Sequence, residues 1–262
     1  MRFAIAIPIQ NPLYEPLISN AQEVCERRGI KLFPCTSERE ASDLLLNRHA
    51  HCALLSPIGY GAGVSRVDYR IIPQTILMLQ GLTYQASAYI NHSAKKLTHA
   101  VSATPDDFLI TLGAMILSEK FDQDTSLEQK EGTVMQLLAE HDVVFARGFD
   151  QAQPISLDIS DEWYDVTDEP LPVALWVCRP QDVPADIADI VQEMSADDLP
   201  DHEHIHEQEL HGTNAEREGM IYWQWNDDVE PALNRVFEML FFRQSVREIP
   251  AVKLWGREPF DA

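Results

Sequence analysis

Small polar side chains occur where several short apolar runs of the sequence end. They are Gln10, Asn11, Ser56, Ser102 and Thr104. Side-chain amides and hydroxyls near helix N-termini bind a carboxylate with uncharged donors, although each of them singly is also a common helix cap. Taken together around one ligand, these side chains predict a binding site for a small carboxylate.

Arg147 follows the apolar run 143–146 and precedes Gly148. The sequence has 262 residues, of which 20 are basic and 42 acidic, so its net charge is −22. A field of this sign repels an anionic ligand, which therefore needs a local cation. We expect Arg147 and Gly148 to supply that anion-binding point; a surface salt bridge from Arg147 to Asp142 or Asp150 is the alternative.

Two acidic residues near the predicted site are unfavourable for an anionic ligand. Asp106 and Asp107 follow Pro105, a residue typical of the first turn of a helix, where acidic side chains interact favourably with the helix dipole. A bound carboxylate would use the same dipole. If the two side chains face the ligand, they favour a neutral or cationic ligand; if they face solvent, they decide nothing.

The sequence lacks the common nucleotide-binding and nucleophile motifs. Gly59, Gly61 and Gly63 come nearest to a phosphate-binding loop, but they follow Pro57 and open no convincing helix. We expect a flexible turn there, with Tyr60 as a lid or as a ring that stacks on the ligand. No organic cofactor is expected.

Histidines alternate with acidic residues in the stretch 195–218. His202, His204 and His206 have the chemistry of a zinc or nickel site, yet helical spacing places only His202 and His206 on one face, and no cysteine adds to them. A solvated acidic helix or loop is the better interpretation, so no metal is expected. A third hypothesis is that this stretch docks a protein partner and that the ligand site is vestigial.

Short apolar runs alternate with segments of helical period, which is typical of an α/β fold with a largely parallel sheet. The predicted strands are 3–9, 30–34, 52–55, 70–79, 84–91, 100–103, 143–146 and 171–178. The predicted helices are 14–28, 38–47, 105–121, 185–194 and 229–243. This order predicts a discontinuous lobe 1 (1–86 and 174–262) and an inserted lobe 2 (87–173), with the ligand in a cleft between the lobes.

Composition excludes several classes of protein. The acidic charge, which no basic run interrupts, is unfavourable for binding to nucleic acid or to an anionic membrane. No apolar stretch approaches the roughly 18 residues that span a bilayer, and the first residues are interpreted as a strand rather than a signal peptide. The cysteines show no CxxC spacing, so reduced core thiols and a cytoplasmic protein are expected. They are Cys25, Cys35, Cys52 and Cys178.

Aromatic residues gather near the C-terminus. They are Trp223, Trp225, Phe237, Phe241 and Phe242. Leu233, Phe237 and Leu240 recur at helical spacing, so core packing against the sheet is expected. A self-association face, and with it a homodimer, is the alternative.

Several segments together resemble one family. Residues 158–163 (DISDEW) and 171–177 (LPVALWV) resemble the DLGxxW and TGLPFVxAxW signature of the chorismate dehydratase family, in the futalosine route to menaquinone. Residues 52–57 (CALLSP), 69–73 (YRIIP) and 221–223 (IYW) are similar to further stretches of that family, in the same order. The resemblance covers most of the chain.

The resemblance implies a type-2 periplasmic-binding-protein fold, which agrees with two lobes. It also implies a cytoplasmic lyase that removes water from chorismate without a metal or organic cofactor, promoted by orientation, hydrogen bonding and aromatisation of the ring. The catalytic candidates are then Gln10, Asn11 and Ser87. The substrate-binding candidates are Ser56, Tyr60, Ser102, Thr104, Arg147 and Gly148.

Three positions depart from the family pattern. Gln10 or Asn11 stands for the family's N-terminal asparagine with shorter spacing, and the arginine that precedes the family's serine is absent near Ser87. Asp107 and Phe108 stand where the family has a Thr–Ser helix cap. The alternative function is therefore a non-catalytic solute-binding paralogue of the same fold with a different small ligand.

Overall fold

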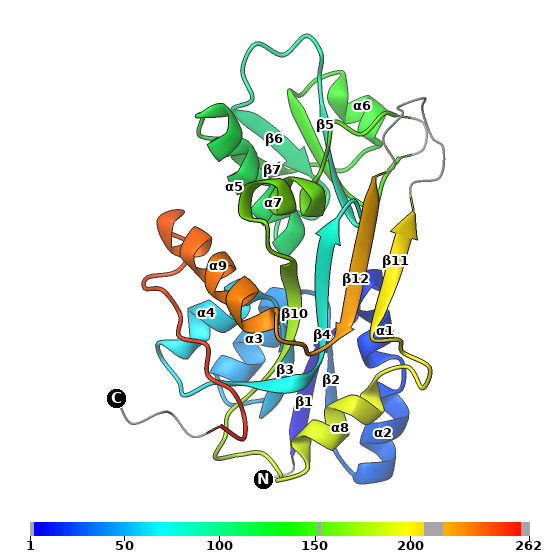
Figure 1. Ribbon diagram of the computed structural model, residues 1–262, viewed down its shortest axis with the longest axis vertical. Helices are drawn as coiled ribbons and strands as arrows, with labels where there is room; N and C mark the ends of the chain where they lie inside the picture. Colours follow the sequence, from blue (N-terminus) through cyan, green and yellow to red (C-terminus); the bar gives the residue numbers. More distant parts are fainter. Residues whose placement is uncertain (1–2, 151–152, 207–216, 258–262) are drawn as a thin grey trace. The chain divides into compact units, whose positions relative to one another are not determined.

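The computed structural model describes residues 3–150, 153–206 and 217–257 (Figure 1). The chain forms two compact units. Unit 1 comprises Met1–Met78, Pro172–Glu203 and Tyr222–Ala262, and unit 2 comprises Leu79–Leu171 and His204–Ile221. The chain changes units inside strands, namely within β4 (Arg70–Gly81), β10 (Leu171–Cys178), β11 (His202–His206) and β12 (Glu218–Gln224).

These limits differ from the predicted lobe boundaries. Residues 79–86 lie in unit 2, residues 172–173 lie in unit 1, and residues 204–221 belong to unit 2 although they were expected in lobe 1. The last difference arises because 202–206 form a strand, where a helix or loop was expected, and this strand carries the chain from unit 1 into unit 2.

A seven-stranded mixed sheet forms the centre of unit 1, with the order β11-β12-β4-β10-β3-β1-β2. β1 (Ala4–Pro8) pairs in parallel with β2 (Lys31–Cys35) and β3 (Cys52–Leu55), whereas β10 pairs with β3 in antiparallel fashion. Every residue of β1, β3 and β10 is buried, as expected for central strands covered on both faces. The carboxyl ends of β1, β2 and β3 therefore share one edge of the sheet.

Short helices connect these strands. In the described part of unit 1 they are the 3-10 helix η1 (Pro12–Tyr14), α1 (Glu15–Ile18), α2 (Ala21–Arg28), α3 (Glu38–Leu46), α4 (Pro57–Val64), α8 (Ile187–Met194) and α9 (Val229–Phe242). The predicted helix 14–28 is interrupted at Asn20, whose N–H donates to the Met194 carbonyl at 3.0 Å. α2 ends at Gly29, whose φ of 67° is a conformation that glycine favours.

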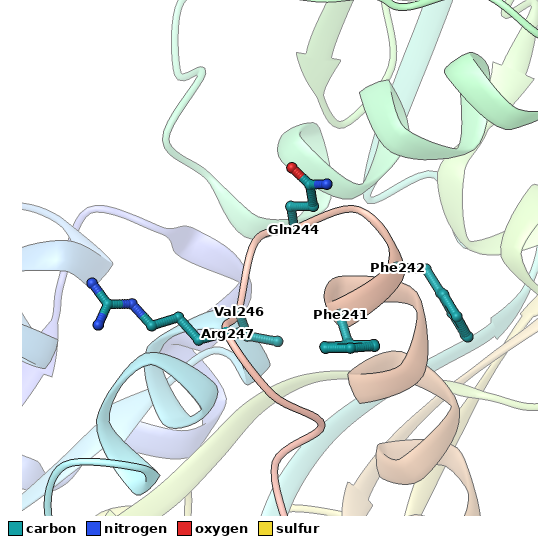
Figure 2. Close-up of a pocket in the computed structure, with 5 residues that line it drawn as sticks. All are labelled: Phe241, Phe242, Gln244, Val246 and Arg247. Carbon is teal, nitrogen blue, oxygen red and sulfur yellow. The ribbon is translucent and has the colours of Figure 1, made fainter.

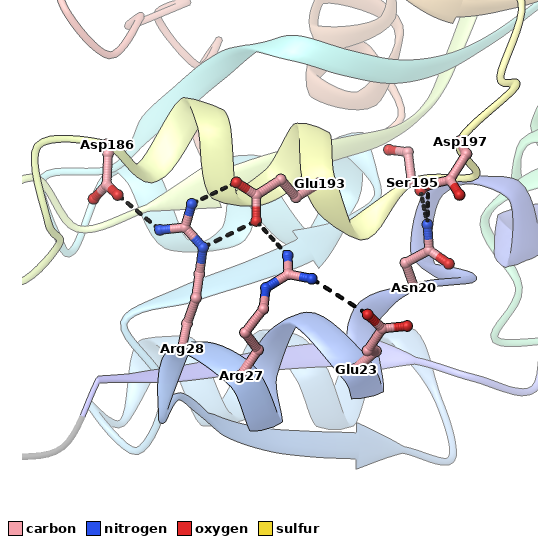
Figure 3. Close-up of polar contacts among 8 residues, drawn as sticks. All are labelled: Asn20, Glu23, Arg27, Arg28, Asp186, Glu193, Ser195 and Asp197. Carbon is pink, nitrogen blue, oxygen red and sulfur yellow. Dashed lines mark hydrogen bonds and ion pairs between the residues drawn. The ribbon is translucent and has the colours of Figure 1, made fainter.

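Ion pairs connect α2 to α8 on the surface of unit 1 (Figure 3). Glu193 accepts from Arg27 at 2.8 Å and from Arg28 at 2.5 Å, and Arg28 also pairs with Asp186 at 2.8 Å. The hydrogen bond from Arg28 is the main cause that lowers the pKa of Glu193. Because these side chains are 28–54% exposed, each pair contributes little stability.

A five-stranded sheet forms the centre of unit 2, with the order β7-β6-β8-β5-β9. Its strands are β5 (Ala86–Ile90), β6 (His99–Ser102), β7 (Ser126–Gln129), β8 (Val143–Arg147) and β9 (Leu157–Asp158). β6 runs parallel to β7 and β8, whereas β5 runs antiparallel to β8 and β9. The helices are α5 (Phe108–Phe121), α6 (Val134–Leu138) and α7 (Ile159–Thr167).

Helices cover both faces of the sheet in unit 2. Val134 of α6 packs with Tyr89 and Val144 on one face. The next residue of β8, Phe145, points to the opposite face because side chains alternate along a strand. There α5 approaches closely at Gly113, where an added Cβ would lie 2.9 Å from Phe145 Cε1.

Most of the predicted elements are confirmed, some with shifted ends. α5 begins at Phe108 rather than Pro105, because Asp107 is its N-cap and not part of its first turn. Three further elements have no counterpart among the predicted ones: the strand 126–129 and the helices 134–138 and 159–167. In the part of the chain that the structure describes, no helix combines the length and apolarity needed to cross a membrane.

The buried core agrees with the expected roles of cysteines and aromatic residues. All four cysteines are buried and free of disulfides. Trp223 and Phe237 are 4% and 0% exposed, so core packing is confirmed for them. Phe242 is 74% exposed, which corrects its assignment to the core.

Candidate functional site

Several segments of unit 2 meet at one edge of its five-stranded sheet. β6 and β8 are parallel, with Val101 opposite Val144, so their carboxyl ends share an edge. β5 runs the other way, with Ala86 opposite Arg147, so its amino end reaches the same edge. The segments that converge there are 82–85, 102–107 and 147–150.

Arg147 forms an ion pair at this edge. Its Nε donates to Oδ2 of Asp107 at 2.7 Å, a partner that the sequence analysis did not consider. The Asp107 side chain is 1% exposed and that of Arg147 is 31% exposed. Asp107 also caps α5, because its Oδ1 accepts from the Leu109 N–H at 2.9 Å. One carboxylate thus orients the guanidinium, starts the helix and offsets the charge of Arg147.

The other polar side chains at this edge shape the turn before α5. Ser102 is 1% exposed, and its Oγ accepts from the Thr104 N–H at 3.2 Å. The Thr104 carbonyl accepts from the Asp107 N–H at 3.1 Å, and the Thr104 side chain is half-buried. Asp106 is exposed. Of the two acidic residues that are unfavourable for an anionic ligand, Asp106 therefore faces solvent and Asp107 is paired with Arg147.

The turn after β8 contacts the segment before β5. Gly148, at a φ of +66° that favours glycine, donates its N–H to the Gln85 carbonyl at 2.8 Å. The rings of Tyr84 and Phe149 lie 4.9 Å apart with an interplanar angle of 45°, and both residues are half-buried. Tyr84 has a φ of 59°, which is uncommon for a bulky residue, and strained backbone of this kind clusters at functional sites.

Asp158 holds Tyr84 in this conformation. Its Oδ2 accepts from the Tyr84 N–H at 2.8 Å, and its Oδ1 accepts from the Ser160 N–H at 3.0 Å. Ser160 Oγ lies 2.7 Å from both Asp158 Oδ1 and Thr83 Oγ1. Burial raises the pKa of Asp158 to about 6, against hydrogen bonds that lower it. Asp158 is not among the predicted site residues, although an Asp directly before a helical segment is an N-cap signal, and it caps α7 here.

Ser87 lies within β5, opposite Ala146 on one side and Asp158 on the other. It is 0% exposed. Its Oγ makes no hydrogen bond of ordinary geometry within the described ranges, although it lies close enough to Tyr89 to lower the pKa of that phenol, which burial raises. Ser87 is thus a buried hydroxyl with unused hydrogen-bonding capacity.

The polar strand ends of unit 1 are helix caps. Asn11 Oδ1 accepts from the Leu13 N–H at 3.2 Å, and Ser56 Oγ accepts from the Gly59 N–H at 3.5 Å. Asn11 and Ser56 are 6% and 4% exposed, whereas Gln10 is exposed. These residues therefore follow strands β1 and β3 as predicted. The side-chain oxygens of Asn11 and Ser56 cap the next helices, which was the alternative to binding a ligand.

Tyr60 lies in the core of unit 1, which corrects its predicted role as a lid or stacking residue. Its side chain is 0% exposed. Its hydroxyl donates to the Ala251 carbonyl at 2.7 Å and accepts from the Lys253 N–H at 3.2 Å, and its ring stacks on Phe237 at 5.4 Å. Burial raises the pKa of this phenol to about 12. Tyr60 therefore anchors the C-terminal segment of unit 1.

Residues 57–64 form α4 rather than the expected flexible turn. Two of its glycines allow close packing. An added Cβ at Gly61 would lie 2.8 Å from Val246 Cγ1, and one at Gly63 would lie 2.0 Å from Tyr69 Cε2. The glycine spacing therefore has a packing cause rather than a role in phosphate binding.

A pocket of about 490 Å³ lies at the C-terminal end of α9 in unit 1 (Figure 2). Its lining residues are Phe241, Phe242, Gln244, Val246 and Arg247, so none of the predicted site residues lines it. In Figure 2 the Arg247 side chain extends away from the two phenylalanine rings. This pocket has aromatic and aliphatic walls and lies apart from the predicted site residues.

The histidine stretch forms a strand over its described part. His202 and His204 are exposed in β11, which corrects the expected helix or loop. The side chain of His206 and residues 207–216 lie outside the described part of the chain. Among the residues that are described, no group of three or more metal-ligating side chains comes together.

Comparisons with known proteins show the fold. No family model matches the chain. No curated protein matches it either. Among solved structures, protein AF1704 from Archaeoglobus fulgidus matches with a TM-score of 0.56 at 12% identity, over 94% of this chain and 98% of that one.

An ABC transporter protein from Parabacteroides distasonis also matches with a TM-score of 0.56, at 8% identity, over 98% of this chain and 99% of the other. At such low identity these likenesses show the architecture alone. The chain accordingly has a type-2 periplasmic-binding-protein-like α/β fold with two sheets.

Proposed function

We propose that the protein binds a small molecule with an aromatic or cyclohexadiene ring and a carboxylate, and that unit 2 supplies contacts to it. The observation that carries this proposal is the convergence, at one sheet edge, of a cation, two hydroxyl side chains and two aromatic rings. Ligand sites commonly combine apolar walls with a few polar groups that fix orientation. The residues are Arg147, Ser102, Thr104, Tyr84 and Phe149.

The rings of Tyr84 and Phe149 are the proposed contact for the ligand ring. They are half-buried and tilted by 45° to each other, so they offer apolar area and a ring face or edge to a ligand ring. The backbone supports them from two sides, through the Tyr84 N–H bonded to Asp158 and the Gly148 N–H bonded to Gln85. Such support lowers the conformational entropy that a ligand must otherwise remove on binding.

Arg147 is the proposed contact for the carboxylate. Its ion pair with Asp107 fixes the direction of a side chain that is still 31% exposed. A guanidinium has several N–H donors in one plane, so it binds a carboxylate while one donor is held elsewhere. Because Asp107 offsets the charge, we expect moderate rather than tight anion binding.

Calorimetric titration tests this proposal. The probes are 3-hydroxybenzoate, the corresponding benzyl alcohol and the corresponding benzylamine. We expect the carboxylate to bind at least about tenfold more tightly than the alcohol, and Arg147→Gln to remove that preference. Arg27→Gln, which removes a surface cation of α2, is the matched control and should leave the affinity unchanged. Equal or tighter binding of the amine would contradict the carboxylate assignment.

A second candidate function is dehydration of chorismate, which the resemblance of residues 158–163 and 171–177 to the chorismate dehydratase family supports. In this reaction a ring proton and a hydroxide leave together as water, and the ring becomes aromatic. Ser87 is one catalytic candidate of this proposal: its hydroxyl is buried and makes no hydrogen bond of ordinary geometry to a described residue, so it would have a donor for the leaving hydroxide if the substrate reaches β5. Gln10 and Asn11 stay as the other catalytic candidates.

Mass spectrometry of a reaction with chorismate separates the two candidates. A product lighter by one water, formed by the wild type and lost in the Ser56→Ala, Arg147→Ala double variant, would establish the lyase. Binding without turnover would leave the non-catalytic solute-binding function. The buried reduced thiols are consistent with the cytoplasmic location that we propose for either.

A further inference from the structure

Side chains at the start of α7 hold the segment that carries Tyr84. The N-cap residue Asp158 accepts from the Tyr84 N–H at 2.8 Å through its Oδ2. Ser160 Oγ lies 2.7 Å from Thr83 Oγ1 and donates to the Gly81 carbonyl at 2.8 Å. Because Thr83, Asp158 and Ser160 are all buried, solvent does not compete for these hydrogen bonds. The start of α7 therefore fixes residues 81–84.

The two carboxylate oxygens of Asp158 have different partners. Oδ1 caps α7, because it accepts from the Ser160 N–H at 3.0 Å and from the Asp161 N–H at 3.1 Å. Oδ2 accepts from the Tyr84 N–H, which belongs to a segment far from α7 in the sequence. A helix cap needs only one side-chain oxygen, as the preference for serine and asparagine at this position shows. The second oxygen is therefore not required for the helix.

The backbone of Tyr84 needs a fixed partner of this kind. Its φ of 59° is unfavourable for a residue with a Cβ, and such a conformation persists only where the surrounding structure determines it. Hydrogen bonds to an ionised carboxylate are stronger than those between neutral groups. Burial raises the pKa of Asp158 to about 6, so this carboxylate is ionised at about pH 7.5.

We propose that Asp158 is a positioning residue of the ligand site, whose Oδ2 fixes the Tyr84 backbone and thereby the direction of the ring that contacts the ligand. The inference rests on the proposed function, which makes this ring a ligand contact. Asp158→Asn separates the two tasks of the side chain. The one oxygen of the new amide can still cap α7. Its NH2 group then faces the Tyr84 N–H, so Tyr84 loses its acceptor.

Amide hydrogen exchange, followed by NMR at about pH 7.5, tests this role without a ligand. We expect Asp158→Asn to speed exchange of the Tyr84 N–H at least about tenfold, while the Ser160 and Asp161 N–H groups of the cap stay protected. Asp228→Asn is the control, because Asp228 precedes α9 and its side chain makes no capping bond to a described residue. Unchanged exchange at Tyr84 in Asp158→Asn would overturn the proposal whatever the ligand does.

A double-mutant cycle with 3-hydroxybenzoate tests whether Asp158 acts through the ring. Tyr84→Gly removes the ring, and glycine adopts the same φ without strain. We expect Asp158→Asn to weaken binding about three- to tenfold in the wild type and to have no further effect in Tyr84→Gly. Equal weakening in both backgrounds would overturn the proposal, because it would show an effect that does not pass through the ring.

The same cycle separates this inference from the proposed function. Weaker binding by Tyr84→Gly with unchanged binding by Asp158→Asn would overturn the role of Asp158 alone. No binding by the wild type, or full affinity in Tyr84→Gly, would contradict the proposed ring contact and with it the positioning role.

Discussion

Asp158 is a carboxyl group that the fold buries at the centre of a hydrogen-bond network. Burial raises its pKa from 3.8 to about 6. At pH values between these two, the folded protein therefore keeps a proton on this carboxyl that the unfolded chain has released. Its contribution to the free energy of unfolding is therefore complete below about pH 4 and is lost as the pH rises through 6.

We predict that the wild type loses roughly 2–3 kcal/mol of stability between pH 4 and pH 6.5 relative to Asp158→Asn. Denaturant unfolding of both proteins across this range measures the difference. A constant offset between the two pH profiles would show that Asp158 does not titrate there.

Substitution of Tyr60 should change the stability of the protein without changing its affinity for the ligand. Tyr60→Phe removes a donor to the Ala251 carbonyl and an acceptor for the Lys253 N–H, so it should lower the free energy of unfolding by about 1–3 kcal/mol. Because the ring is buried in unit 1, affinity for the aromatic carboxylate should not change. A loss of affinity with unchanged stability would restore the lid role that the structure argues against.

The individual candidates show how far sequence reasoning reaches. Asn11 and Ser56 lie at strand ends as predicted, since the boundary between an apolar run and a polar residue marks where a strand stops. Their partners were not predictable, because a cap and a ligand contact require the same side chain at the same place. The Asp107–Arg147 pair joins residues far apart in the sequence, and only the parallel register of β6 and β8 brings them together.

Helix α4 offers a matched pair of substitutions. Gly63→Ala would place a Cβ 2.0 Å from Tyr69 Cε2, whereas Gly59→Ala would place one 3.4 Å from Leu55 Cβ, an ordinary contact. We expect Gly63→Ala to destabilise the protein by about 1–3 kcal/mol or more. Gly59→Ala should be neutral or stabilise by up to about 1 kcal/mol. Chemical denaturation measures both, and equal effects would refute the packing explanation of the glycines.

The contact between α2 and α8 rests partly on Glu193, which pairs with both Arg27 and Arg28. We expect Glu193→Gln to lower the free energy of unfolding by no more than about 1 kcal/mol, with a smaller effect in high salt because the pairs are exposed. Glu238→Gln, which breaks the single pair with Arg235, serves as control and should have no measurable effect. A salt-independent loss would point to packing rather than charge.

Elements with strong periodicity or clear caps were predictable, as the central strands β1, β3 and β10 and the long helices α5 and α9 show. Residues 57–64 were misassigned because glycine spacing was interpreted as flexibility, when close packing requires those glycines. Residues 202–206 were predicted as a helix or loop but form a strand. Their histidines alternate with other residues, and this period of two, which is typical of a strand, was interpreted only as a metal-ligand pattern or a solvated surface.

The whole molecule combines a net charge of −22 with a proposed anionic ligand. An acidic field slows the approach of an anion, and this effect weakens as salt screens it. Binding must therefore depend on local contacts, which the structure offers at one sheet edge of unit 2. The pocket at the end of α9 is the competing location, since it has aromatic walls and Arg247.

Hydrogen–deuterium exchange with and without 3-hydroxybenzoate tests this central claim most directly, because it locates the ligand without any substitution. We predict that binding slows exchange in residues 84–87, 102–107 and 147–149, and leaves 241–247 unchanged. Slowed exchange confined to 241–247, or none anywhere at saturating ligand, would contradict the proposed site.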